Sequence, residues 1–121
     1  MPERRILIVE DDADVREALA MAMRDAGAEV DLAEDGVAAL ERLRTGPSPA
    51  VVLLDLRLPR LGGEGLVAAL RADPRFERLP IITMTAGTGS VSGDVVARLQ
   101  KPFDFDDLRR IVESLFDAPS Q

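Results

Sequence analysis

Strand-like runs alternate with amphipathic stretches along the chain, and this alternation restricts the possible fold more than any other feature. Amphipathic stretches with apolar residues at helical spacing lie within residues 14–26, 37–43, 66–70 and 105–115. Such alternation predicts an α/β fold with a parallel sheet and right-handed crossovers. The most continuous apolar run is expected to be a central strand with both faces covered. In chain order, the strand-like runs are Arg5–Val9, Glu29–Ala33, Ala50–Leu54 (the most continuous), Pro80–Met84 and a fifth that ends at Lys101.

Capping and breaking residues set the expected limits of the helices. Asp14 is expected to cap the first helix, and Gly27 is expected to end it. The second helix is expected to end at Thr45-Gly46-Pro47, the third near Asp73-Pro74, and the last helix to begin near Asp104.

The segment Ala86–Arg98 departs from the alternation. It begins rich in Gly and Ser, and only Asp94–Ala97 could be helical, for barely one turn. A fourth helix before the last one is therefore expected to be short or missing. The Gly-rich part, residues 86–93, superficially resembles a phosphate-binding loop, but it lacks the lysine that such a loop requires. A flexible connection, which could become ordered on phosphorylation or partner binding, is the preferred interpretation.

Composition excludes several classes of function. The chain of 121 residues is expected to be one domain, with a core over residues 5–116 and a tail over 117–121. It contains neither Cys nor His, so thiol and imidazole chemistry are excluded. A formal net charge of −7 argues against direct contact with nucleic acid. There is neither a signal peptide nor a run of roughly 18 apolar residues, so a cytoplasmic protein without membrane contact is expected.

Polar residues follow the apolar runs where the strands are expected to end. The first strand ends in Glu10-Asp11-Asp12, and later strands end in Asp55, Thr85 and Lys101. Because the carboxyl ends of parallel strands share one edge of a sheet, these side chains are expected to lie together. Clustered carboxylates suit Mg²⁺, and an Asp can act as a nucleophile toward phosphorus. Lys101 and the metal would then neutralise charge on the phosphoryl oxygens.

Each of these residues also has a purely structural interpretation. Asp11 and Asp12 could cap the first helix, and Asp55 could be a turn residue. Thr85 could simply end a strand, and Lys101 could be a solvated surface charge. Their joint occurrence at one edge favours a functional site.

Several motifs together resemble the receiver domain of two-component response regulators. The resemblance extends from about Arg5 to Phe116. It implies a flavodoxin-like, doubly wound sheet of five parallel strands in the order 2-1-3-4-5. The motifs are Ile6–Asp12, Ala33–Gly36, Leu54–Pro59, Thr85-Ala86 and Lys101–Phe103.

The resemblance also implies a phosphorylation site. Asp55 would receive a phosphoryl group from a histidine of a kinase or a phosphotransfer protein. Mg²⁺ would be bound by Asp12, Asp55 and the backbone carbonyl of Arg57, with Asp11 acting through water.

The remaining implied roles concern the phosphoryl oxygens. Thr85 and Lys101 would contact these oxygens, together with the backbone N–H of Ala86. The Lys101-Pro102 peptide bond would be cis, as it often is in this family.

Two features depart from the family pattern. The position that usually holds an aromatic switch residue, three before the lysine, holds Arg98, and the interval from Thr85 to Lys101 is short. Side chains at the positions of Arg57 and Gly87 often tune self-dephosphorylation in this family. The chemistry is therefore expected to carry over better than the mechanism of output.

The leading hypothesis is a phosphorylation-dependent binding switch that catalyses only its own phosphorylation and dephosphorylation. It would act as a monomer or as a dimer formed on phosphorylation, within a stand-alone regulator, a phosphorelay intermediate or a longer protein. One alternative is a degenerate receiver that serves as a constitutive docking domain. Another is a phosphohydrolase with an Asp nucleophile, which Arg57 disfavours because such enzymes commonly place a second acid there.

Overall fold

The computed structural model describes residues 4–57, 61–85 and 95–116, and they form one parallel sheet with helices on both faces. The sheet has five strands in the order β2-β1-β3-β4-β5, which confirms the predicted flavodoxin-like arrangement. The strands are β1 (Arg5–Val9), β2 (Glu29–Ala33), β3 (Val51–Asp55), β4 (Ile81–Thr85) and β5 (Ala97–Gln100).

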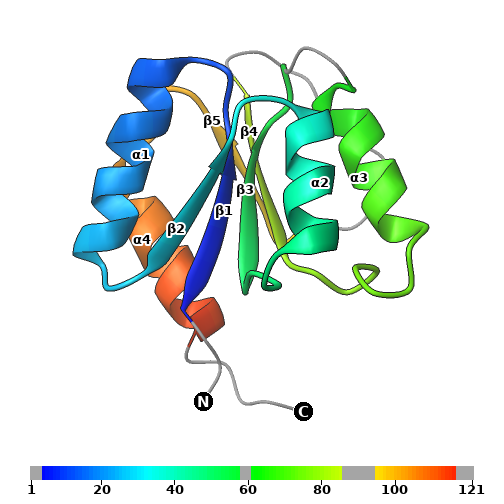
Figure 1. Ribbon diagram of the computed structural model, residues 1–121. Coiled ribbons are helices and arrows are strands. Elements are labelled where there is room, and N and C mark those ends of the chain that lie inside the picture. Colours follow the sequence, from blue (N-terminus) through cyan, green and yellow to red (C-terminus); the bar gives the residue numbers. More distant parts are fainter. Residues whose placement is uncertain (1–3, 58–60, 86–94, 117–121) are drawn as a thin grey trace.

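Two helices cover each face of the sheet (Figure 1). On one face lie α1 (Ala13–Asp25) and α4 (Phe105–Phe116), and on the other lie α2 (Gly36–Thr45) and α3 (Gly63–Arg71). Along β1, Ile6 and Ile8 pack into the cluster that contains the buried residues of α1 and α4, whereas Leu7 and Val9 pack toward α2 and α3. This period of two is the reason that a continuous apolar run can serve two separate cores.

The central strand β3 is buried at all five positions, as its apolar sequence predicts. Because α/β crossovers place helices on both faces of a parallel sheet, a central strand has no solvated face. Its last residue, Asp55, is therefore carried into the interior and is only 6% exposed.

The first helix begins earlier than predicted. Asp12, rather than Asp14, is its N-cap, and the Asp12 carboxylate accepts hydrogen bonds from the backbone N–H groups of Asp14 and Val15. The prediction of Asp14 as the cap was wrong because consecutive acidic residues offer several equivalent caps, and the end of β1 selects among them. Gly27 ends the helix with a φ of 90°, as predicted.

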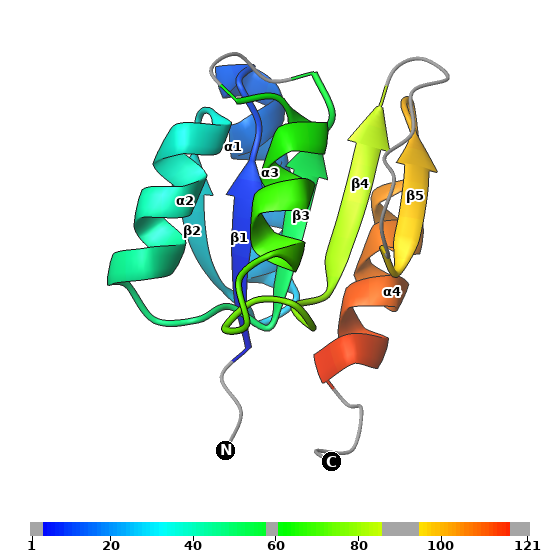
Figure 2. The same ribbon diagram turned by 90° about the vertical axis from the view of Figure 1, so that its right-hand side faces the viewer.

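The connection between β4 and β5 shows no helix in its described part. Val95 and Val96 are not helical, and Ala97, which was included in the predicted helical turn, belongs to β5. The Gly-rich part, residues 86–93, and Asp94 lie outside the described residues. The described helices α2 and α3 lie over β1, β2 and β3 but not over β4 and β5 (Figure 2).

Among the described residues, every helix is too short or too polar to span a bilayer.

A close backbone approach explains one glycine beside the end of β3. A Cβ at Gly63 would lie 2.7 Å from the Cα of Leu56 and 3.0 Å from the carbonyl oxygen of Asp55. At Gly65, also in α3, a Cβ would meet only the side chain of Leu61. The absence of a side chain at Gly63 therefore lets α3 begin directly against the chain that leaves Asp55.

We predict opposite effects for alanine at these two glycines. Gly63→Ala should lower the free energy of unfolding by about 1–3 kcal/mol, because backbone atoms have to move. Gly65→Ala should leave stability unchanged or raise it by up to about 1 kcal/mol, because alanine favours helix and the Leu61 side chain can rotate. Urea unfolding followed by circular dichroism measures both. Equal effects of the two variants would contradict the steric argument.

Candidate phosphoacceptor site

The register of the sheet brings two acidic residues to the same level. Strands β1 and β3 pair in parallel from Ile6 opposite Val51 to Val9 opposite Leu54. The next residue on each strand is acidic, namely Glu10 after β1 and Asp55 at the end of β3. Two carboxylates from distant parts of the sequence are thereby held side by side at the carboxyl edge of the sheet.

Lys101 connects these two carboxylates. Its Nζ lies 3.0 Å from Oε2 of Glu10 and 3.3 Å from Oδ2 of Asp55. Glu10 is 1% exposed and Asp55 is 6% exposed, so both acids are removed from bulk water. An ammonium group between two buried carboxylates is the dominant electrostatic interaction of this edge.

Burial changes the titration of this group of residues. Burial is the main cause that raises the pKa of Glu10 from 4.5 to about 7, and the neighbouring Asp55 adds to it while Lys101 opposes it. Burial alone would lower the pKa of Lys101. Hydrogen bonds and charges from Glu10 and Asp55 outweigh that effect, so the pKa of Lys101 is raised above 10.5.

A third carboxylate, that of Asp11, completes a group able to hold a cation. Glu10, Asp11 and Asp55 each offer an oxygen, and these oxygens lie within 4.8 Å of one another. Among the described residues, Lys101 is the only cation that an ion pair links to this group. Three ionised carboxylates and this ammonium group would carry a net charge of about −2, which favours a divalent cation. Carboxylate oxygens, two of them from buried side chains, fit the hard ligands that Mg²⁺ prefers.

Asp12 and Glu10 differ from the sequence-based expectation. The carboxylate of Asp12 is exposed and caps α1 instead of joining the group of three oxygens. Glu10, which was not among the predicted metal ligands, belongs to that group of three oxygens. The role of Glu10 could have been inferred from the strand register. When the last apolar residues of the two strands, Val9 and Leu54, are aligned, Glu10 lies level with Asp55.

The chain that follows Asp55 turns back toward the carboxylate. The backbone N–H of Arg57 donates to Oδ1 of Asp55 at 2.9 Å, and the Arg57 residue itself is exposed. The N–H of Leu56 donates to the carbonyl of Met84. One carboxylate oxygen of Asp55 thus faces the loop and the other faces Lys101.

The ends of β4 and β5 supply the remaining predicted residues. Thr85 is the last residue of β4 and is partly buried, and its carbonyl accepts a hydrogen bond from the N–H of Lys101 at 2.7 Å. The Lys101-Pro102 bond is cis. Ala86 and Gly87 lie outside the described residues. Arg98 is exposed on β5, where it pairs with Thr83 of β4.

An apolar groove opens beside Lys101. Its volume is about 530 Å³, and it lies between α1 and the chain that leads into α4. The other described lining residues are Asp14, Val15, Ala18, Leu19, Pro102, Phe103 and Phe105.

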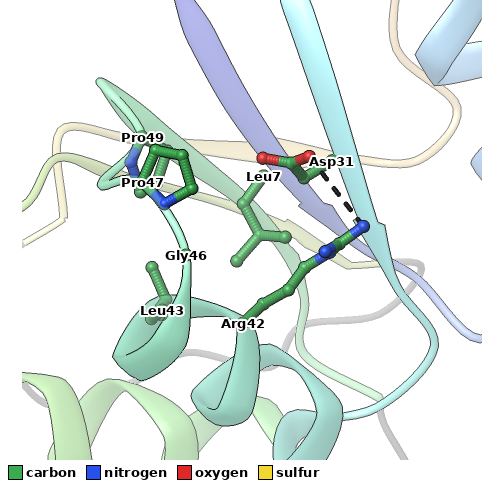
Figure 3. A pocket seen from close by; sticks show the side chains of 7 residues that line it. All are labelled: Leu7, Asp31, Arg42, Leu43, Gly46, Pro47 and Pro49. Carbon is green, nitrogen blue, oxygen red and sulfur yellow. Dashed lines mark ion pairs between the residues drawn. The ribbon is translucent and has the colours of Figure 1, made fainter.

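A smaller pocket lies beside β2, which is the outermost strand on the side of the sheet away from β5 (Figure 3). Its volume is about 40 Å³, which suffices for one or two water molecules. Arg42 of α2 reaches across it toward Asp31 of β2, with 3.9 Å between Nη2 and Oδ1, and donates from Nε to the carbonyl of Leu32. The pocket is therefore a packing feature between α2 and the edge strand.

Comparison with known proteins agrees with this geometry. Response regulator Rre1 of Synechocystis sp. is 35% identical over 119 residues, which are 91% of this chain and 50% of Rre1. The DNA-binding response regulator MtrA of Mycobacterium tuberculosis is 40% identical over 101 residues, 84% of this chain and 42% of MtrA. The chain thus spans half or less of these two relatives.

A solved structure matches over nearly its full length. The receiver domain of the sensor histidine kinase PA1611 from Pseudomonas aeruginosa is 29% identical, with a TM-score of 0.87, and the match covers 96% of this chain and 99% of that one. That structure has a magnesium ion coordinated in its active-site cleft. Residues 6–113 of this chain match the family described as the response regulator receiver domain, and the chain belongs to that family.

Proposed function

We propose that Asp55 is the phosphoacceptor of a magnesium-dependent receiver domain that spans about residues 5–116. The observation that carries the proposal is the contact of Lys101 with both Asp55 and Glu10 at the carboxyl edge of the sheet. A buried ammonium group beside a carboxylate suits a site at which negative charge increases during a reaction.

This arrangement supports phosphoryl transfer to Asp55. A carboxylate oxygen of Asp55 would attack the phosphorus of a phosphohistidine or of a small acyl phosphate. The new O–P bond forms as the bond to the leaving group breaks, and the electron pair leaves with the imidazole nitrogen or the acyl oxygen. Lys101 would offset the charge of the phosphoryl oxygens, and the Thr85 hydroxyl would donate to them.

Glu10, Asp11 and Asp55 would hold Mg²⁺, with the backbone carbonyl of Arg57 as a further ligand. The ion supplies charge neutralisation for the transferring group. In this assignment Asp12 keeps its role as the cap of α1. The backbone N–H of Ala86 stays a proposed contact of the phosphoryl oxygens, and the positions of Arg57 and Gly87 stay proposed tuning positions.

The phosphorylated domain would act as a switch for partner binding. A histidine kinase or a phosphotransfer protein would be the donor, and the domain would catalyse only the gain and loss of its own phosphoryl group. With its net charge of −7, the domain is proposed to work in the cytoplasm without direct contact with nucleic acid. It would be a monomer or a dimer formed on phosphorylation.

A constitutive docking domain is the second candidate, because the apolar groove beside Lys101 offers a surface that a partner could occupy. The two functions differ in their dependence on Asp55. A docking domain would bind its partner equally well as the wild type or as Asp55→Asn, with or without a phosphodonor.

We predict that acetyl phosphate with Mg²⁺ adds one phosphoryl group to the wild type and none to Asp55→Asn. The Asn side chain has nearly the same shape but lacks the nucleophilic carboxylate. Intact-mass spectrometry measures the gain. As a control, Asp73→Asn alters an exposed ion pair with Arg75, far along the chain from the site, and should be phosphorylated normally. A phosphoryl group that persists on Asp55→Asn would refute the assignment.

We also predict a pH dependence of stability in the metal-free protein. The raised pKa of Glu10 means that the folded state binds a proton more tightly than the unfolded state. This contribution to stability is fully present below pH 4.5 and is lost as the pH rises through about 7. Since the chain has no His, few other groups titrate in this range.

The comparison of wild type with Glu10→Gln isolates this effect. Urea unfolding in EDTA at pH 5, 6, 7 and 8 should show the wild type losing stability relative to Glu10→Gln as the pH rises, because the amide cannot ionise. Saturating Mg²⁺ should oppose the loss in the wild type, since the cation binds the ionised carboxylate. Parallel pH profiles of the two proteins in EDTA would rule out the buried acid as the cause.

A further inference from the structure

We infer that Arg16 is a positioning residue for the cation site, through the backbone of Glu10. Arg16 lies in α1 and is partly buried, and its Nη1 donates to the carbonyl oxygen of Glu10 at 2.8 Å. The inference rests on the proposed function, because it concerns how the carboxylates for Mg²⁺ are oriented.

Arg16 hydrogen-bonds to a main-chain carbonyl although acidic residues lie close to it in the sequence. Acidic residues flank it at Asp12, Asp14 and Glu17, and Asp12, the N-cap of α1, stands four positions earlier, a spacing at which an ion pair forms readily. Within the described ranges, Arg16 nevertheless pairs with no carboxylate. Its guanidinium is instead directed at a main-chain carbonyl, while the Asp12 carboxylate caps the helix.

The carbonyl in question belongs to the peptide that joins two of the three clustered acids. Glu10 and Asp11 are consecutive, and both offer oxygens to the group that includes Asp55. Glu10 lies one residue beyond β1, so the ladder within β1 no longer determines how its carbonyl is oriented. The hydrogen bond from Arg16 determines it.

The other side of Glu10 is also held. Its N–H donates to the carbonyl of Ala33 at the end of β2, with 3.1 Å between nitrogen and oxygen. Its side chain accepts from the N–H of Asp12 at Oε1 and from Lys101 at Oε2. The backbone bonds to Ala33 and Arg16 hold the main chain of Glu10 independently of the contact between its side chain and Lys101.

Orientation matters because Mg²⁺ demands near-octahedral geometry at about 2.0–2.1 Å. Groups that hold metal ligands in place commonly contribute 10-fold to 100-fold in affinity. Loss of the Arg16 bond would free the peptide between Glu10 and Asp11 to rotate. The two carboxylates would then have to be ordered when the cation binds.

The test compares three variants for Mg²⁺ affinity, measured by calorimetry and by amide chemical shifts. Arg16→Gln should bind Mg²⁺ about 10-fold more weakly than the wild type. Arg16→Lys keeps one donor and the charge, and should lie between them. Arg24→Gln makes the same change of charge at an exposed position near the other end of α1, and should bind as the wild type does.

Phosphorylation by acetyl phosphate separates positioning from a general structural role. Arg16→Gln should need more Mg²⁺ for half-maximal rate yet approach the wild-type rate at saturating Mg²⁺. Its thermal midpoint in EDTA should stay close to that of Arg24→Gln. A lower thermal midpoint of Arg16→Gln with unchanged Mg²⁺ affinity would overturn the inference. It would also be overturned if Arg16→Lys bound Mg²⁺ as tightly as the wild type and lost this affinity at high salt, because the charge alone would then explain the role of residue 16.

The same measurements distinguish an error in the proposed function from an error in the role of Arg16. If the wild type bound no Mg²⁺ and accepted no phosphoryl group, the proposed function itself would be wrong. If the wild type did both and Arg16→Gln matched it at every Mg²⁺ concentration, only the role of Arg16 would be refuted. If Arg16→Gln fails to fold, Arg16→Lys decides the test alone. Weaker binding of Mg²⁺ by Arg16→Lys with a normal thermal midpoint would support the positioning role, and unchanged binding would refute it.

Discussion

The ammonium group of Lys101 is the interaction on which the carboxyl edge of the sheet depends. It contacts Glu10 beyond β1 and Asp55 at the end of β3, and it is carried by the residue that follows β5. Two carboxylates in such buried positions would repel each other strongly without a cation between them. The lysine therefore makes it possible for three strands to end in charged groups at one point.

One lysine does not balance three carboxylates, and the imbalance has a physical consequence. With its pKa raised to about 7 by burial, Glu10 would retain a proton near neutral pH when no cation is bound. A divalent cation would replace that proton and offset the charge of all three carboxylates, which already lie together. Destabilising acids at a strand edge are typical of a functional site, where a local violation of packing rules is maintained by the rest of the fold.

The fold was predictable because its signals are periodic. Apolar runs and amphipathic stretches predicted the parallel sheet, and the central position of β3 followed from its unbroken apolar sequence. The exact roles of three consecutive acids were less accessible. Sequence alone did not show that Asp12 caps α1 and that Glu10 faces Asp55, because this division depends on where β1 ends relative to β3. A shift of one residue exchanges the roles of neighbours.

Contacts of a residue with the backbone of a neighbouring segment were even less predictable from the sequence. The bond from Arg16 to the carbonyl of Glu10 involves a donor whose nearest natural partners, by spacing, are acidic side chains. A pattern of charges predicts ion pairs, and here the geometry of the turn between β1 and α1 selects a main-chain acceptor instead. Gly63 is similar, since its requirement arises from a backbone that lies seven residues earlier.

The position of Lys101 also limits how a change at Asp55 could reach the surface. Arg98 is exposed on the edge strand β5. Lys101, by contrast, contacts Asp55 with its side chain, hydrogen-bonds to Thr85 through its N–H, and lines the apolar groove with Phe103 and Phe105. Any group added to Asp55 has to compete with Glu10 for this lysine. Lys101 is therefore the shortest physical connection between Asp55, the proposed phosphoacceptor, and a surface that could bind a partner.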